Sequence, residues 1–474
     1  MPGCFMEDSI LKPLIPQLEG IIDRTLERER VPGAAIGIVH DQEHVWSRGF
    51  GYADLASDRF PTADTLFRCG SITKTFTATA ILQLRDEGKL AIDDPLVRYI
   101  PEFGAVKARF GKPQDVTIRR LLTHTSGLAG EGPNNGWEKL EFPPIEDMVA
   151  ALGRTEILIE PETQYKYSNL GYALLGEVIA RVSGRRYPDY IQRNLLEPLE
   201  MNDSGFHLTD SMRAQMATGY TICTTEGEPQ VAPHPKLNGW DAAGSLYSSV
   251  NDLARWISLQ FRTGAPARAS SQVLKGDALS AMHRMQFMEP DWMAGYALGW
   301  RADRRGENIY HHHSGGIHGF LTKITFNKQY RVGAIVLTNA SPHMAFETIG
   351  YELLEAIIPA LHAASEAVHS LPKPVPTPEK YRRFIGRYED PQMGGVIWMV
   401  SRRGELIILN PGSATVPPAP DQRLVPTDDP LVFTLDAGRP AGEPLVFRID
   451  KDGKVVGLLM SHAWAFRKVA PIGE

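Results

Sequence analysis

A run of alternating prolines divides this chain into two parts of different character. From Leu371 to Pro378 every second residue is proline, and such a run favours an extended polyproline conformation that acts as a stiff linker. The length of 474 residues also exceeds the usual size of one domain. We therefore predict a first domain over residues 1–370, a linker over 371–378 and a second domain over 379–474.

The first domain has strand patterns at both ends and helical patterns between them. Apolar residues recur at helical spacing in Leu14–Arg30 and then follow strand patterns in two short segments. Near its end the domain shows three adjacent strands and a closing helix. The strands are expected at Ala34–His40, His44–Phe50, Asn308–His313, Gly319–Asn327 and Arg331–Thr338, and further helices from Ser71 and over Arg119–Leu122, Met148–Leu152, Tyr172–Val182, Asn251–Phe261 and Ala345–Ala360. This order predicts an α/β (α+β) fold, in which an antiparallel sheet is flanked by helices and carries a helical insert.

Short strands and turns make up the second domain. Asp452-Gly453 separates the apolar segments Leu445–Ile449 and Val455–Leu459, which is a strong hairpin signal. Two further strand segments precede it at Val396–Val400 and Leu406–Leu409. We predict an all-β domain, a small barrel or sandwich.

Charge and cysteine content exclude several kinds of function. A net charge of −6 argues against a nucleic-acid surface, and no apolar stretch reaches the length of a membrane span. Cys4, Cys69 and Cys223 are odd in number and widely separated, so they do not form a disulfide framework. The first residues lack the pattern of a leader peptide. These features favour a cytoplasmic protein, although removal of a leader would leave the same sequence.

The pattern Ser-x-x-Lys places an amine beside a serine hydroxyl, because residues three apart share a helix face. Such an amine can activate the weak serine nucleophile. The pattern occurs at Ser9–Lys12, Ser71–Lys74 and Ser370–Lys373. Ser9 precedes the core elements and Ser370 opens the proline run, so Ser71 is the one that begins an amphipathic helix. A plain helix cap remains the alternative role for Ser71.

Two further patterns each occur once in the chain. They are Tyr167-Ser168-Asn169 and His313-Ser314-Gly315, the second of which we expect to end a strand. Taken singly, Tyr167 fits a tyrosine at the edge of the core and His313 fits an ordinary strand histidine.

In this order the three patterns resemble those of serine β-lactamase-like and penicillin-binding-protein-like hydrolases. The resembling branch contains class C β-lactamases, family-VIII-type esterases and D-aminopeptidases. The runs Leu121–Leu128, Ala242–Ser248 and Gly315–Phe320 support the resemblance, which covers about Leu14 to Ala360. The second domain resembles, weakly, the lipocalin-like barrels of some such peptidases. That likeness implies a role in homo-oligomer assembly or in shaping the entrance to the site.

The resemblance implies a role for each matching residue. Ser71 would attack a carbonyl carbon and become acylated, while Lys74 and Tyr167 would handle protons, with either one as the base. Asn169 would hydrogen-bond the substrate or Lys74, and His313 would move protons or hold an anionic group.

The remaining matches concern the backbone around the third pattern. The N–H groups of Ser71 and Gly316 would form the oxyanion hole. The small residues Ser314, Gly315 and Gly316 would let the substrate lie alongside the strand.

These roles imply a serine hydrolase that cleaves a small ester, an amide or a short peptide through an acyl-enzyme and needs no cofactor. A carboxylesterase or a peptidase, including an aminopeptidase, is the favoured activity. A β-lactamase and an acyltransferase would use the same residues, and a non-catalytic penicillin-recognising sensor or scaffold is an alternative of another class. The substrate walls are expected at Ala129–Glu146, Thr221–Trp240 and Met285–Tyr296.

A histidine cluster offers a metal site as a rival interpretation. His311 and His313 share a strand face, whereas His312 points to the other, and His318 follows in the next turn. Without a placed carboxylate or cysteine, this set is poor for zinc. We expect no metal.

Overall fold

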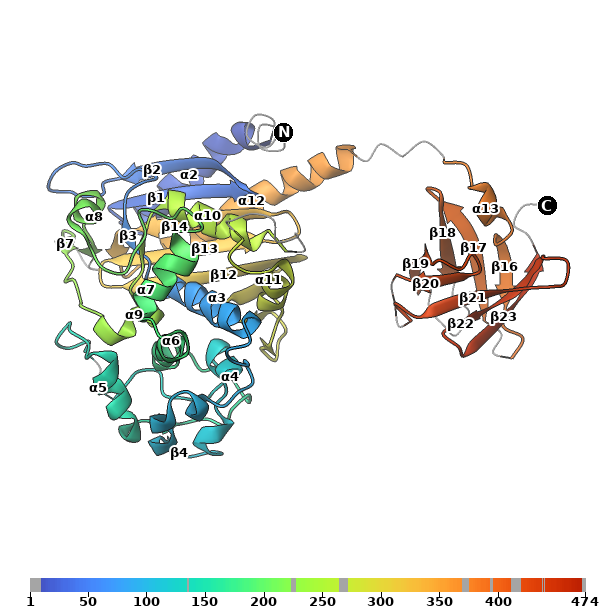
Figure 1. The fold of residues 1–474 in the computed structure, drawn as a ribbon. Coiled ribbons are helices and arrows are strands. Elements are labelled where there is room, and N and C mark those ends of the chain that lie inside the picture. Colours follow the sequence, from blue (N-terminus) through green and yellow to red (C-terminus); the bar gives the residue numbers. More distant parts are fainter. Residues whose placement is uncertain are drawn as a thin grey trace. The chain divides into compact units, whose positions relative to one another are not determined.

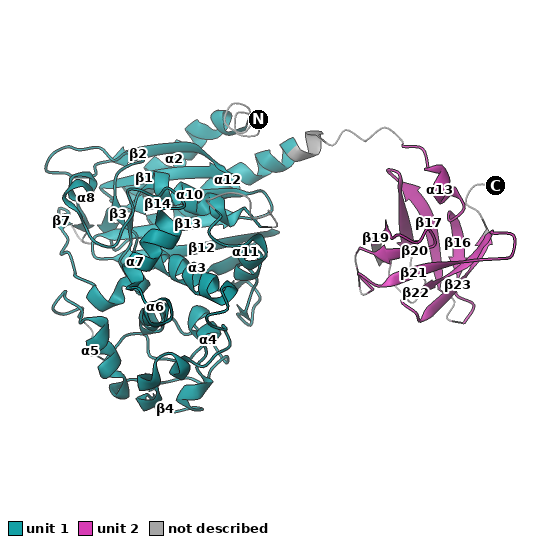
Figure 2. Ribbon diagram, in the orientation of Figure 1, with its two compact units in different colours: residues 1–364 teal, residues 365–474 magenta. Residues whose placement is uncertain are grey.

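A computed structural model describes residues 10–133, 136–222, 227–263, 272–368, 375–392, 395–410, 419–436, 438 and 440–470. Contacts divide the chain into two compact units, residues 1–364 and 365–474 (Figure 2). Residues 371–374 of the predicted linker lie outside the described residues.

An eight-stranded sheet forms the first unit's centre, in the order β2-β1-β14-β13-β12-β11-β10-β9 (Figure 1). Its strands are β1 (Gly33–His40), β2 (Glu43–Gly51), β9 (Phe287–Met288), β10 (Ala294–Tyr296), β11 (Arg301–Arg305), β12 (Asn308–Ile317), β13 (Phe320–Asn327) and β14 (Val332–Thr338). All neighbours are antiparallel, and β1 pairs with β14 from Ala34 opposite Thr338 onward. The predicted antiparallel sheet with strands from both ends of the domain is therefore confirmed.

The helices of the first unit cover both faces of this sheet and also form a helical part beside it (Figure 1). They are α2 (Lys12–Arg28), α3 (Thr73–Asp86), α4 (Ile118–Leu122), α5 (Ile145–Ala150), α6 (Asn169–Ser183), α7 (Tyr187–Ile191), α8 (Asp210–Gln215), α9 (Asp241–Gly244), α10 (Val250–Gln260), α11 (Gly276–Met282) and α12 (Ala345–Val368). Along β1, Ile36 and Ile38 enter the core that α2 and α12 cover, while Ala35 and Val39 enter the core that contains α3 and α10. This alternation is the two-residue period of a strand with both faces covered.

Smaller sheets lie outside the central sheet. They pair β3 (Phe67–Arg68) with β8 (Tyr247–Ser248), β4 (Lys107–Ala108) with β5 (Glu156–Ile157), and β6 (Tyr220–Thr221) with both β7 (Gln230–Val231) and β15 (Ala340–Ser341). No described helix combines the length and apolar character of a membrane span.

Strand β12 extends well beyond its predicted end. The His313-Ser314-Gly315 pattern was expected to end a strand, but β12 continues to Ile317 and pairs with β13 throughout. Glycine lowers strand propensity in sequence patterns, whereas here backbone pairing carries the strand through both glycines. The pattern therefore presents strand backbone, rather than a loop, to its surroundings.

The second unit is a closed antiparallel barrel. It contains α13 (Glu379–Arg382) and the strands β16 (Gly386–Glu389), β17 (Val396–Arg402), β18 (Glu405–Asn410), β19 (Ala419–Pro426), β20 (Val432–Leu435), β21 (Pro444–Ile449), β22 (Val455–Met460) and β23 (Trp464–Ala470). Closure comes from the pairing of β16 with β23. Alternate residues such as Tyr388, Met399 and Phe447 form a separate hydrophobic core. The predicted all-β barrel is confirmed, and its role in assembly stays a prediction.

Candidate functional site

A short 3-10 turn, η2 (Gly70–Ile72), carries Ser71 immediately before α3. The preceding Cys69 is fixed because its N–H donates to the carbonyl oxygen of Leu246 at 2.8 Å. Gly70 has a φ of +51°, a left-handed conformation that favours glycine. No side-chain cap hydrogen bond occurs at this helix entry, so the capping alternative for Ser71 has no support here.

Lys74 lies one helical turn beyond Ser71 and is fully buried. Its Nζ lies 3.0 Å from Ser71 Oγ, 2.8 Å from Asn169 Oδ1 and 2.6 Å from the carbonyl oxygen of Ala243. A charged ammonium can donate to all three oxygens. A neutral amine can donate to Asn169 and Ala243 and accept the Ser71 hydroxyl proton. The same geometry therefore accommodates both protonation states.

Burial also makes the neutral form of Lys74 accessible. Loss of hydration lowers the pKa of the Lys74 amine to about 7, against the opposing effect of the Glu131 charge. An amine with a pKa close to neutrality is well matched to general base catalysis. Both geometry and protonation thus allow Lys74 to take a proton from Ser71.

The Tyr-x-Asn pattern lies at the start of α6. Ser168 caps this helix, since its hydroxyl oxygen accepts the N–H of Gly171 at 3.0 Å. That cap places Asn169 in the first turn beside Lys74, and the Tyr167 hydroxyl shares a hydrogen bond with Ser71. Burial raises the pKa of the Tyr167 phenol well above its ordinary value. Tyr167 therefore faces the nucleophile as a neutral phenol.

Strand β12 packs directly against the nucleophile turn. A Cβ atom on Gly315 would lie 1.8 Å from the carbonyl oxygen of Cys69, and one on Gly70 would lie 2.7 Å from the nitrogen of Gly316. Thr322 on β13 also donates its hydroxyl to the Cys69 carbonyl at 3.0 Å. The backbones of Ser71 and Gly316 thus lie close together, as an oxyanion hole would require.

Substitution of Gly315 tests this close approach. Gly315→Ala should lower the midpoint of thermal unfolding by about 5 °C, because overpacking costs roughly 1–3 kcal/mol and the contacted atom belongs to the backbone. Differential scanning calorimetry measures this shift. Gly104→Ala is the matched control, since open space surrounds that position; equal melting of the two variants would contradict the packing argument.

His313 lines the site as a neutral side chain. Its Nδ1 lies 2.7 Å from the carbonyl oxygen of Ser314 and must therefore donate, while Nε2 lies 3.0 Å from the Tyr296 hydroxyl and can accept. Burial lowers the pKa of His313 to about 3. The expected roles of His313 in proton movement or anion binding stay predictions, and this tautomer supplies no positive charge.

His124, which lies within the run Leu121–Leu128, contacts Tyr167 and the backbone of Ser168. Its ring centroid lies 4.2 Å from that of Tyr167, and its Nδ1 accepts the N–H of Ser168 at 3.1 Å. Burial lowers the pKa of His124 well below its ordinary value. The neutral ring therefore positions Tyr167 without adding charge beside Lys74. Its place within the run Leu121–Leu128 was the available sequence signal.

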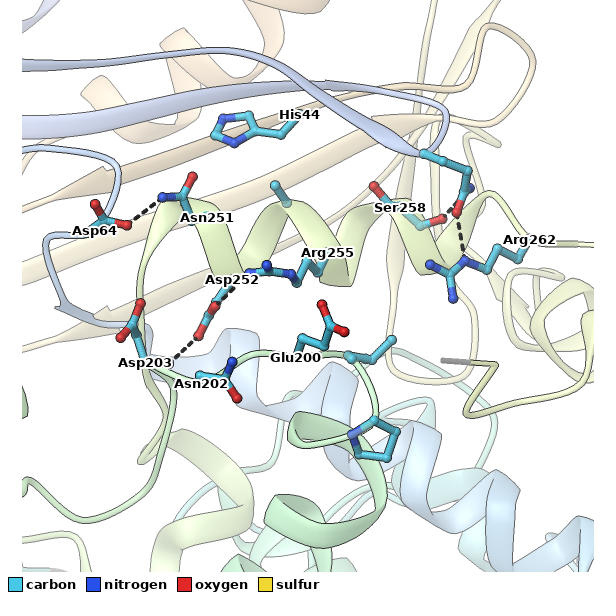
Figure 3. A pocket seen from close by; sticks show the side chains of 14 residues that line it. His44, Asp64, Glu200, Asn202, Asp203, Asn251, Asp252, Arg255, Ser258 and Arg262 are labelled. Atoms are coloured by element: carbon cyan, nitrogen blue, oxygen red, sulfur yellow. Dashed lines mark hydrogen bonds and ion pairs between the residues drawn. The ribbon is translucent and has the colours of Figure 1, made fainter. Parts of the chain in front are cut away.

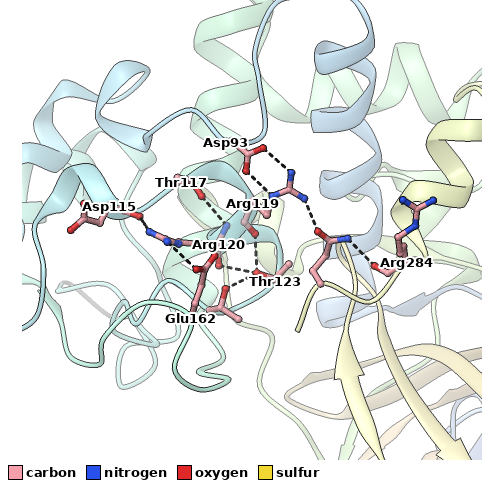
Figure 4. A network of polar contacts seen from close by, with 10 residues as sticks. Asp93, Asp115, Thr117, Arg119, Arg120, Thr123, Glu162 and Arg284 are labelled. Atoms are coloured by element: carbon pink, nitrogen blue, oxygen red, sulfur yellow. Dashed lines mark hydrogen bonds and ion pairs between the residues drawn. The ribbon is translucent and has the colours of Figure 1, made fainter. Parts of the chain in front are cut away.

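A polar network anchors α4, the helix that leads into His124 (Figure 4). Arg119 donates to both carboxylate oxygens of Asp93 at 2.7 and 2.8 Å and to Gln286 at 2.6 Å. Arg120 donates to Glu162 at 3.0 Å. These contacts link α4 to the chain after α3, to the segment before β9 and to the segment before α6.

A cavity of about 250 Å³ opens beside Ser71. Its lining combines catalytic candidates with aromatic and apolar side chains. The lining residues are Ser71, Tyr165, Tyr167, Tyr296, Arg301, His312, His313, Ser314, Gly315, Gly316, Leu321 and Phe346. Among the three predicted walls, the third contributes Tyr296. The structure thus brings Ser71, Tyr167 and residues 313–316 to one cavity, with buried Lys74 and half-buried Asn169 beside Ser71.

A larger cavity, of about 620 Å³, lies elsewhere in the first unit (Figure 3). It is lined by polar and charged side chains that contact one another, such as Asn251 with Asp64 at 2.5 Å and Arg255 with Asp252 at 3.4 Å. None of Ser71, Lys74 and Tyr167 lines it. The smaller cavity is therefore the candidate active site.

The other sequence candidates do not come together as a metal site or as a second nucleophile, although His312 lines the cavity. His311 lies 3.0 Å from the carbonyl oxygen of His283, and His312 lies 3.1 Å from Asp303. No group of three metal-ligating side chains occurs among the described residues. Burial raises the pKa of the Cys69 thiol, as expected of a structural cysteine. Cys4, Cys223, Ser9, Ser370 and Lys373 lie outside the described residues.

Comparisons of sequence point to one family. The Beta-lactamase family model matches residues 18–357. Protein flp from Staphylococcus aureus is 29% identical over 68% of this chain, and the match spans 62% of that protein's length. Beta-lactamase-like protein 2 from Dictyostelium discoideum is 25% identical over 85% of this chain and 76% of its own length.

Solved structures give the same result for the fold. The octameric penicillin-binding protein homologue from Pyrococcus abyssi has a TM-score of 0.59 and 26% identity, over 96% of this chain and 100% of its own. A class C β-lactamase has a TM-score of 0.60 and 23% identity, over 72% of this chain and 96% of its own. The first of these similarities extends across both units.

Proposed function

Since this chain belongs to the Beta-lactamase family, we propose that it is a serine hydrolase that works through an acyl-enzyme on Ser71. The observation that carries the proposal is the double contact of the Ser71 hydroxyl with Lys74 Nζ, at 3.0 Å, and with Tyr167. A serine that meets a potential base on one side and a neutral phenol on the other has what nucleophilic catalysis requires. A non-catalytic sensor or scaffold that only binds its ligand would not need this arrangement.

In the acylation step, neutral Lys74 takes the proton of Ser71 while Ser71 Oγ attacks the carbonyl carbon of the substrate. The carbonyl oxygen gains negative charge, which the N–H groups of Ser71 and Gly316 stabilise. The tetrahedral intermediate then expels the leaving alcohol or amine, which receives a proton from the Tyr167 hydroxyl. The Lys74 ammonium then gives its proton to the Tyr167 phenolate beside the acylated Ser71 oxygen, which leaves both groups neutral.

Deacylation reverses these roles with water as the nucleophile. Water enters where the leaving group departed, gives its proton to the neutral amine of Lys74, and attacks the acyl carbon. Collapse of the second intermediate releases the acid and restores the Ser71 hydroxyl. This route needs no group beyond the residues already described at the site.

Electrostatics favour an uncharged ester over a substrate that carries a carboxylate. Arg301 is the one arginine or lysine among the described residues that line the cavity, and its guanidinium lies 3.0 Å from Asp303 and 3.3 Å from Glu289. His313 is neutral there, as argued above. The cavity therefore offers an anionic substrate no uncompensated cation. We propose a carboxylesterase, with small amides as a second substrate class.

Comparison of two chromogenic substrates tests this preference. The kcat/KM for p-nitrophenyl butyrate, an uncharged ester, should exceed that for nitrocefin, a β-lactam with a carboxylate, by about 100-fold or more, since the compensated Arg301 cannot offset the cost of burying that charge. Steady-state rates of the wild type, after subtraction of the rate of the Ser71→Ala variant, give both values. Faster turnover of nitrocefin would support a β-lactamase instead.

A further inference from the structure

The carboxylate of Glu131 reaches Lys74 through a side-chain amide. Asn169 donates its Nδ2 to Glu131 Oε1 at 2.7 Å, and its Oδ1 accepts from Lys74 Nζ at 2.8 Å. A carboxylate accepts and an ammonium donates, so the two ends together fix which way the Asn169 amide points. Glu131 does not line the cavity beside Ser71. It lies behind Asn169 rather than against the substrate.

The groups that face Lys74 from the surrounding elements are otherwise uncharged. The ring centroids of Tyr167 and Tyr172 lie 4.9 and 5.6 Å from its Nζ, and burial keeps both phenols neutral. His124 and His313 are neutral as described above. Glu131 is thus the acidic side chain whose charge Lys74 experiences.

The environment of Glu131 is itself partly apolar. Burial raises the pKa of the Glu131 carboxyl, while Asn169, Lys74 and the Trp137 indole oppose that effect. Trp137 in turn packs near the ring of His318, with centroids 5.5 Å apart. The loop that the sequence suggests as a substrate wall therefore also supplies a charge next to the base.

We propose that Glu131 is a positioning residue of the hydrolase site: through the Asn169 amide it holds Lys74 against Ser71 and keeps a negative charge beside the Lys74 ammonium. The inference rests on the proposed function for its consequence in catalysis, but its electrostatic part concerns Lys74 alone. Glu131 favours the charged form of Lys74. It therefore raises the pH below which the site is inactive, against the larger effect of burial.

The first test measures Lys74 directly and needs no substrate. Protein labelled with [13Cε]lysine is titrated by NMR, and Lys74 is assigned by its absence from the Lys74→Ala spectrum. Glu131→Gln retains an acceptor for Asn169 but removes the charge, so the Lys74 midpoint should fall by about one pH unit. Glu138→Gln, an exposed change of the same kind on the same loop, should leave the midpoint unchanged. Equal midpoints in wild type and Glu131→Gln would overturn the proposal.

A second measurement uses the NMR titration of Lys74 in the wild type and so does not depend on the folding of a variant. Because the two groups interact, protonation of Glu131 at acid pH should appear as a smaller second step on the Lys74 resonance. The absence of that step would also overturn the proposal.

Catalysis provides the third reading. The rate of fluorophosphonate labelling of Ser71 should fall at acid pH in both proteins. In Glu131→Gln the midpoint of this fall should lie about one pH unit lower than in wild type. A wild type that is never labelled would refute the hydrolase function alone, since the NMR titration reports on Glu131 independently. An unchanged limb alongside a shifted NMR midpoint would overturn the catalytic part of the inference.

Discussion

Replacement of Ser71 by alanine should abolish ester hydrolysis and covalent labelling together. The loss in kcat should be on the order of 10^4-fold or more, because the covalent route disappears and only the oxyanion hole and binding remain. Alanine removes a single oxygen from a half-buried position, so the fold should survive. Intact-mass spectrometry after incubation with a fluorophosphonate, together with p-nitrophenyl butyrate kinetics, measures both effects.

The matched control for this result is Ser57→Ala. Ser57 is an exposed serine in a turn, where its hydroxyl donates to Asp54, so its loss should change neither labelling nor rate. Peptide mapping of the wild-type adduct should place it on the segment that contains Ser71. An adduct that persists in Ser71→Ala, or hydrolysis that survives there, would refute the acyl-enzyme assignment.

Local patterns predicted the longer strands of the central sheet, β1, β2, β12, β13 and β14, because both sheet faces are buried there, whereas the short strands β9, β10 and β11 were not predicted. The strands around Ile36 and Val336 follow from short runs rich in β-branched residues, and antiparallel pairing followed from their order along the chain. The end of β12 was missed. Its extension depends on the backbone of Gly315 packing against Cys69, a tertiary contact that no local pattern reports.

The order of the three short patterns along the chain predicted the residues of the candidate site, but it did not predict their protonation states. Ser71, Lys74 and Tyr167 could be named from three short patterns, while the choice of base between Lys74 and Tyr167 stayed open. That choice depends on burial, which acts in opposite directions on an amine and a phenol. Glu131 could not be found from sequence because its role requires Asn169 as a bridge across 38 residues.

Removal of the Lys74 side chain should give the second large loss of activity. The pH dependence of kcat/KM in the wild type and in Lys74→Ala then identifies the base. In the wild type, kcat/KM for p-nitrophenyl butyrate should fall about tenfold per pH unit below pH 7 or so, because protonated Lys74 cannot accept the Ser71 proton. Burial gives the Lys74 amine a pKa of about 7, so the rate should be level above that pH. Lys74→Ala should lose on the order of 10^3-fold in kcat/KM, and the acid limb should vanish with it.

Tyr167→Phe separates the two candidate bases. If Lys74 is the base, this variant should be slower by roughly 100-fold, through loss of a proton donor to the leaving group, and should keep an acid limb close to the wild-type position. Because the pKa of the Tyr167 phenol is raised by burial, a phenolate base would require ionisation far above neutral pH. An acid limb that disappears in Tyr167→Phe but persists in Lys74→Ala would therefore assign the base to Tyr167 and reverse the mechanism proposed above.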